Sequence, residues 1–187
     1  MKRKTHLLSA LLTGILTLVL CGCGKASTPT IRQSDLSQDA RQISTIFGDD
    51  AAYFDFTTDD TISHAVLTVY TCQNGSWTEQ DNLMELDEIQ PGSYRLGIRR
   101  MDDTITAALL EGDASSIFNG TVPPENIAAL DDGSISGATQ LEAQDIIAGE
   151  EIPLLVRAAD RDALEVLDLD FRSIHCDAGI AFTITFT

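Results

Sequence analysis

The segment HAVLTVYTCQNGSW, residues 64–77, contains the pattern that decides the fold. Its first ten residues are rich in β-branched and aromatic side chains, which strands favour. Asn74 and Gly75 follow directly, and both tolerate the positive φ that a two-residue hairpin turn needs. Such a turn sets Cys72 opposite Trp77. The segment therefore predicts an antiparallel β-hairpin.

The C-terminal residues 180–187 carry the clearest period of two in the chain. One side of this predicted strand is apolar, and the other is formed by Ala181, Thr183, Thr185 and Thr187. The apolar side is formed by Ile180, Phe182, Ile184 and Phe186. Strands of antiparallel sheets often have one buried face and one solvated face. We therefore expect this strand to lie inside a sheet, or at least to pack on the core, with only its apolar face buried.

Further short strands with turn residues between them are expected along the rest of the chain. They begin with the alternating pattern from Tyr53 onward and continue at residues 94–101, 104–110, 137–143, 151–159 and 164–171. Residues 112–134 read as the longest connection, with a helical turn at 124–130. This spacing predicts an all-β fold, an antiparallel β-sandwich of about eight strands.

The N-terminal part divides into a signal, a tether and a helix. Residues 2–4 are basic and residues 7–20 are largely apolar, which is the layout of a secretion signal and too short for a membrane-spanning helix. Residues 23–35 are rich in Ser, Thr and Pro and predict a flexible tether before a single domain at 36–187. The spacing of apolar residues over 36–47 predicts a short helix, with Ser34 or Asp35 as N-cap and Gly48 as C-cap.

The end of the apolar run, Leu20-Cys21-Gly22-Cys23, resembles the lipobox of bacterial lipoproteins. The resemblance implies that residues 1–22 are removed and that Cys23 carries a diacylglyceryl lipid. Two acyl chains are enough for stable anchoring, so the expected partner of the N-terminus is the membrane. The expected location is the extracytoplasmic face of the cell membrane. Beyond the anchor, the chain is similar in layout to small uncharacterised β-sandwich lipoproteins of Gram-positive gut bacteria.

The chain is strongly acidic, with a formal net charge of −17. Three of its 12 basic residues and none of its 29 acidic residues lie in the expected signal, so the processed protein is more acidic still. This charge repels phosphate backbones and excludes nucleic acid as a partner. It also repels anionic lipid, so the anchoring is left to the lipid on Cys23.

Cys72 and Cys176 are the cysteines outside the signal region, and each lies just before a turn. The sequence leaves two states open for them: a disulfide, which persists outside the cytoplasm, or two separate half-buried thiols. Their spacing does not match a metal site. His64 and His175 are expected at the surface or at strand ends, and His175 and Cys176 would face opposite sides of a strand.

The sequence has no pattern that assigns catalytic, cofactor or metal residues. Gly133–Gly137 resembles a nucleophile elbow at a glance, but its central residue is Ile135. Phosphate loops and dinucleotide fingerprints do not occur. Paired acids such as Asp59-Asp60 and Asp102-Asp103 are typical of solvated turns, and calcium at such loops is the alternative interpretation.

Tyr70 and Trp77 are the candidate ligand-facing aromatics, because they share the hairpin face opposite Leu67 and Val69. The alternative is that both pack beneath the long connection or the tether. The sequence favours a non-enzymatic function, as a binding or envelope-structural module. Its ligand would be a protein or a glycan, and the sequence does not identify which. The alternative function is a secreted cell-wall or glycan hydrolase that uses two carboxylates.

Overall fold

The computed structural model describes residues 28–46, 51–130, 135–162 and 167–187. The expected signal and Cys23 lie outside these residues. The described part contains, in chain order, β1 (Thr30–Gln33), α2 (Gln38–Ile46), β2 (Ala51–Thr58), β3 (His64–Gln73), β4 (Ser76–Asp87), β5 (Gly92–Met101), β6 (Thr104–Glu111), β7 (Ala114–Thr121), α3 (Pro124–Ile127), the 3₁₀ helix η1 (Ala128–Leu130), β8 (Ile135–Gln140), β9 (Ala143–Asp145), β10 (Glu151–Asp160), the 3₁₀ helix η2 (Phe171–Ser173) and β11 (Ala178–Phe186).

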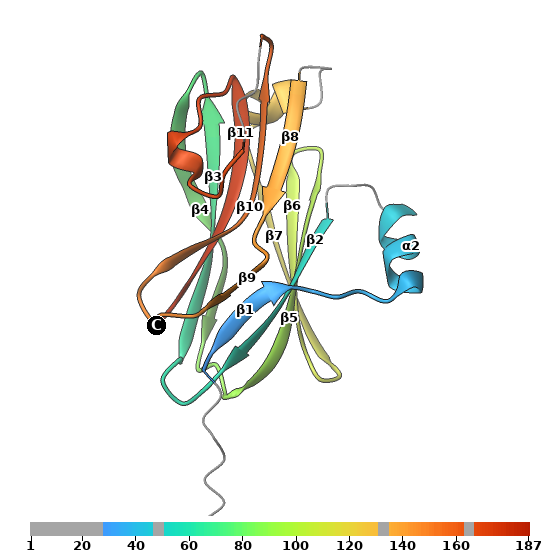
Figure 1. Cartoon of the computed structure of the whole chain (residues 1–187), viewed down its shortest axis with the longest axis vertical. Helices are drawn as coiled ribbons and strands as arrows, with labels where there is room; N and C mark the ends of the chain where they lie inside the picture. The colour runs from blue at the N-terminus through green and yellow to red at the C-terminus, as the bar shows by residue number, and fades with distance from the viewer. Residues whose placement is uncertain (1–27, 47–50, 131–134, 163–166) are drawn as a thin grey trace, which may run out of the picture.

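The strands form two antiparallel sheets that face each other (Figure 1). The six-stranded sheet has the order β7-β6-β5-β2-β1-β9, and the five-stranded sheet has the order β4-β3-β11-β10-β8. The predicted all-β sandwich is confirmed, with eleven strands among the described residues where about eight were expected.

The predicted hairpin is present with the predicted register. Asn74 and Gly75 have φ of 50° and 77°, and Cys72 lies opposite Trp77. This left-handed turn matches the twist of the two strands that it joins. Because the turn fixes which residues of β3 face inward, it also fixes which residues reach the outer side of the sheet.

The main core lies between the sheets. Phe56 of β2 stacks on Tyr94 of β5 at a centroid distance of 5.0 Å and touches Phe186 of β11 at 5.3 Å. β11 is the central strand of its sheet, as expected, and all four of its predicted apolar residues are buried. Its other side differs from the prediction, because Ala181 and Thr183 are only 0% and 1% exposed. The side of β11 that was expected to be exposed to solvent is covered by the connection between β10 and β11.

The tether prediction is wrong at its C-terminal end. β1 pairs with β2 on one side and β9 on the other, and Ile31 is fully buried. The sandwich therefore begins at Thr30 instead of residue 36. A strand this short has too few residues for a visible period of two, so the sequence pattern did not reveal it.

The helix predicted over residues 36–47 is observed as α2 and is shorter. Its first turn is capped by Ser37, whose hydroxyl accepts a hydrogen bond from the amide of Ala40 at 3.2 Å, instead of by Ser34 or Asp35. Ile43, expected on a buried face, is exposed. Gly48, the expected C-cap, lies outside the described residues. Figure 1 shows α2 beside β2 of the six-stranded sheet, and Ser44 of α2 donates its hydroxyl to that of Tyr53 at 3.5 Å, so α2 lies against one part of the outer face of this sheet.

Two assignments in the second half of the chain are wrong. Residues 112–134 contain the strand β7 in addition to the predicted helical turn, which is present as α3 and η1. The sequence of β7, ASSIFNGT, lies at a sheet edge and lacks apolar alternation. The strand predicted at 164–171 is absent from its described part, where 167–170 are irregular and η2 begins at Phe171. The strand expected at 137–143 is divided between β8 and β9.

Candidate functional site

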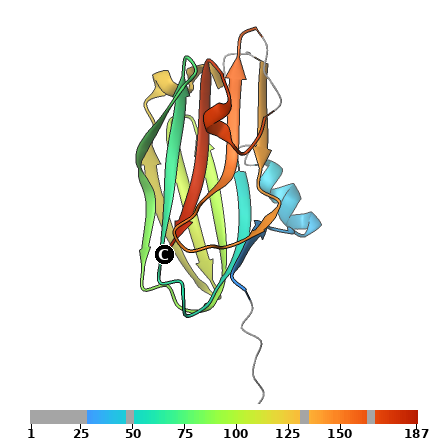
Figure 2. The same cartoon turned by 60° about the vertical axis from the view of Figure 1, so that its left-hand side comes forward.

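The two outer faces of the sandwich differ in what covers them. On the five-stranded sheet, the connection between β10 and β11 folds back over the outward side chains, and η2 lies outside β3 and β11 (Figures 1 and 2). A second apolar cluster lies beneath it, formed by Tyr70, Cys72, Val156, Ala158, Phe171, Ile174, Cys176 and Ala181. All four residues singled out from the sequence, the two aromatics and the two cysteines, meet in or against this cluster.

Tyr70 and Trp77 pack under the connection instead of facing a ligand. Tyr70 is 8% exposed, and its ring centroid lies 5.0 Å from that of Phe171. Trp77 meets the same ring edge-on at 4.9 Å and donates its indole N–H to the carbonyl oxygen of Ile174 at 2.9 Å. Both aromatics therefore pack inside the protein and do not face a ligand. Their cover is the β10–β11 connection, and not the connection at 112–134 or the tether that the sequence offered as the alternative.

Cys72 and Cys176 lie side by side as free, buried thiols. The thiol of Cys72 donates to the carbonyl oxygen of Cys176 at 3.5 Å. The pKa of Cys176 is raised because its thiol is hydrogen-bonded to the sulfur of Cys72 and is buried. The structure thus brings the pair together without joining it, and a disulfide stays a prediction.

A polar network seals the rim of this cluster. Arg172 forms an ion pair with Glu151, with Nη1 2.7 Å from Oε2, and its guanidinium lies 4.6 Å above the ring of Tyr70. Thr183 donates its hydroxyl to Glu151 at 3.0 Å. Burial opposes ionisation of Glu151, but hydrogen bonds from Arg172 and Thr183 and the charge of Arg172 outweigh it and lower the pKa. Burial raises the pKa of Tyr70, so its hydroxyl stays protonated. This network holds the β10–β11 connection against the sheet, and its charged groups are paired with one another.

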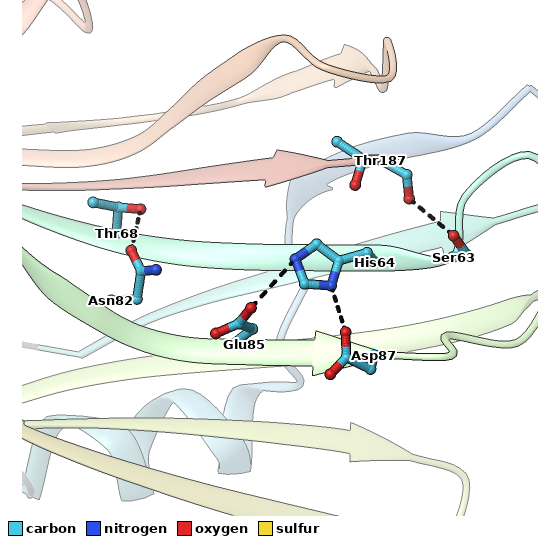
Figure 3. A network of polar contacts seen from close by, with 7 residues as sticks. All are labelled: Ser63, His64, Thr68, Asn82, Glu85, Asp87 and Thr187. Carbon is cyan, nitrogen blue, oxygen red and sulfur yellow. Dashed lines mark hydrogen bonds and ion pairs between the residues drawn. The ribbon is translucent and has the colours of Figure 1, made fainter.

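His64 belongs to a separate surface network near the end of the chain (Figure 3). Its Nδ1 lies 2.9 Å from Asp87, and its Nε2 lies 3.8 Å from Glu85. Ser63 donates to the terminal carbonyl of Thr187 at 3.4 Å in the same view. Within the described ranges, no group of three or more His, Cys, Asp and Glu side chains is placed to hold a metal. His175 lies elsewhere, beside Gly75 in the hairpin turn.

The sequence singled out no two carboxylates for hydrolysis, and in the structure some of the described carboxylates have structural partners. A cleft of about 160 Å³ contains Glu125 and Asp177, but Asp177 is paired with Arg161 at 3.6 Å. Asp59 accepts two hydrogen bonds from Thr61 in its turn, which lower its pKa. Asp49-Asp50 and Asp131-Asp132 lie outside the described residues.

The outer face of the six-stranded sheet is the candidate functional surface. We call it the open face and define it by six outward residues of β1, β2, β5, β6 and β7: Arg32, Tyr53, Asp55, Arg95, Leu110 and Ile117. Leu110 and Ile117 are 41% and 66% exposed. Large aliphatic side chains this exposed, side by side on one face, are typical of interaction surfaces.

The charges of this face differ from those of the whole chain. The outward positions of its six strands carry Arg32, Arg95 and Arg99 but only two of the 29 acidic residues, Asp55 and Asp145. Protein interfaces are likewise enriched in Arg, Tyr and Met and depleted in Asp, Glu and Lys. A protein with a net charge of −17 thus has one broad face without net negative charge.

Hydrogen bonds link the side chains at the centre of the open face. Arg95 donates from Nε to Asp55 at 2.6 Å, and Ser34 donates to the same carboxylate oxygen at 2.8 Å. These bonds, that from Arg95 first, lower the pKa of Asp55. The Tyr53 ring lies against Gly97, where an added Cβ would come within 3.3 Å of it. A preordered surface loses little side-chain entropy when a partner binds.

Two clefts open at this face. One, of about 430 Å³, lies between Arg32 and Arg95 and includes Leu110. The other, of about 480 Å³, lies between α2 and Tyr53. Both volumes fall within the range of about 300–1,000 Å³ found for ligand sites. The sequence contained the outward residues of this face, but a period of two does not tell which of two outer faces a loop will cover.

Within the described residues, the chain has no helix with the length and apolar character needed to cross a membrane. Searches of protein-family models, curated proteins and solved structures find nothing that matches this chain.

Proposed function

We propose that this chain is a lipid-anchored extracytoplasmic protein and that its sandwich is a non-enzymatic interaction module working through the open face. The composition of that face carries the proposal: exposed aliphatic residues, arginine and tyrosine on a protein that is acidic elsewhere. The lipobox resemblance at Leu20–Cys23 supports the anchor. The alternative, a hydrolase with two carboxylates, has less support, because Asp55 and Glu151 are held by arginines and their pKa values are lowered, opposite to what a general acid needs.

The anchor is tested by fatty-acid labelling in a bacterial host. The unmodified chain is expected to take up labelled fatty acid and to stay with the membrane. Cys23→Ala is expected to lose the label and to be released, because its N-terminus then has no acyl chains. A Cys23→Ala chain that still takes up label would contradict the assignment and point to Cys21.

The interaction surface is tested by placing a benzophenone amino acid in the full-length chain in cells. Position 117 lies on the open face, and position 135 is a matched isoleucine on β8 of the other sheet, 52% exposed. Irradiation is expected to give a discrete crosslinked product from position 117 and none from position 135. Equal products from the two positions, or none from position 117, would contradict the proposal.

A further inference from the structure

We propose that the partner of the open face is a second copy of this chain, anchored in the same membrane. The inference rests on the proposed function and deepens it by naming the partner. It follows from the charge of the face, its area and its position relative to the anchor.

The charge of the chain restricts where two copies can meet. The full chain has a net charge of −17 and each processed copy is more negative still, so like-charge repulsion opposes contact between most parts of their surfaces. On the open face, Arg32 and Arg95 outnumber the carboxylate of Asp55, which Arg95 already neutralises. Two such faces bring no excess of negative charge together. Arg32 of each copy can also form an ion pair with a carboxylate of the other copy. A two-fold interface makes every such contact twice, once in each direction.

The area of the face is sufficient for a specific dimer. Six strands spaced about 4.8 Å apart, with the longer ones rising about 3.3 Å per residue over eight residues, outline roughly 600 Å². Standard interfaces bury about 600–1,000 Å² on each partner, so the face lies at the lower end of that range. Leu110 and Ile117 would supply the apolar anchors, and Arg95 and Tyr53 the residue types that dominate binding energy.

The anchor places two copies in a compatible orientation. β1 begins at the lower end of the sandwich in Figure 1, and Thr30 follows Cys23 by seven residues, which span at most about 25 Å. A two-fold axis parallel to the strands and normal to the membrane would join the open faces and keep both anchors at one end. Confinement to one leaflet also raises the effective concentration of each copy for the other.

Sedimentation equilibrium tests this inference on the processed lipoprotein in detergent whose density matches the solvent, so that only protein mass is measured. The unmodified protein is expected to be a reversible dimer. Leu110→Glu is expected to raise the dissociation constant at least tenfold, because it places a charge where the interface would bury an apolar side chain. Ile135→Glu, on the other sheet, is the matched control and should leave the constant unchanged. Because Leu110 is exposed, the Leu110→Glu variant should fold, and its circular dichroism spectrum checks this. Arg32→Glu is a second variant that should weaken the dimer.

The outcomes separate this inference from the proposed function. A protein that stays monomeric at all concentrations, or a dimer that neither Leu110→Glu nor Arg32→Glu weakens, overturns the second copy as partner. If position 117 then still crosslinks in cells to a different molecule, the open face remains an interaction surface and only the identity of its partner is wrong.

Discussion

At the scale of single residues, the sandwich places neighbours on β11 in two different apolar environments. Phe182 points into the core between the sheets, and Thr183 points outward under the β10–β11 connection, where it binds Glu151. Both side chains are buried, although the sequence pattern predicted that Thr183 would be exposed to solvent. The period of two identified the inward residues correctly but could not show that residues 167–177 of the β10–β11 connection would cover the outward ones.

This difference gives a contrast that unfolding measurements can test. Phe182→Ala is expected to cost about 3–5 kcal/mol, because it leaves a cavity in the core. Thr183→Val keeps the volume and removes one hydrogen bond to a carboxylate, which is expected to cost about 1.5–3 kcal/mol. Urea unfolding measures both. Equal losses would contradict the two-sided arrangement of β11.

At the scale of elements, the β10–β11 connection is held by Phe171. Phe171→Ala is expected to loosen the connection and to expose Trp77, because both Trp77 and Tyr70 pack on that ring. Trp77 is the one tryptophan of the chain, so its fluorescence reports this site alone. The emission should shift to longer wavelength under native conditions. An unchanged spectrum would mean that the connection does not depend on this contact.

The cysteine pair ties the same connection to the first hairpin. Oxidation of Cys72 and Cys176 to a disulfide, with a small-molecule disulfide as the oxidant, would close a loop of about 100 residues and is expected to stabilise the fold by about 4–5 kcal/mol. Melting temperature measured with and without reductant checks this, and Cys176→Ala is the control that should show no difference. A Tm insensitive to reductant in the unmodified protein would mean that the thiols remain separate.

The β10–β11 connection should also weaken in acid. The pKa of Glu151 is lowered in the folded state, so this group stabilises the fold above its ordinary pKa and the stabilisation is lost as pH falls through the lowered value. The unfolding free energy should therefore fall below about pH 4, and Glu151→Gln should flatten that fall. Identical acid profiles for the variant and the unmodified protein would contradict the role of the Glu151–Arg172 pair.

At the scale of the whole molecule, the sequence predicted the class of fold, the first hairpin and the packing of the last strand on the core. These rest on local signals: Asn74-Gly75 and the alternation of Ile180 to Phe186. The edge strand β7 and the short strand β1 carry weak patterns and were found only in the structure. The open face could not be predicted either, because it depends on which outer face receives the β10–β11 connection, and that is decided by contacts far apart in sequence.

The central claim is that the open face is covered when the protein is anchored in its membrane. Methionine oxidation by peroxide tests it directly in a Leu110→Met variant, with the buried Met84 as internal reference and Ile135→Met as the exposed control on the other sheet. We predict that Met at position 110 is oxidised several-fold more slowly in anchored protein on cells than in dilute purified protein. Met at position 135 should react at the same rate in both. Equal rates at position 110 in the two states would contradict the account.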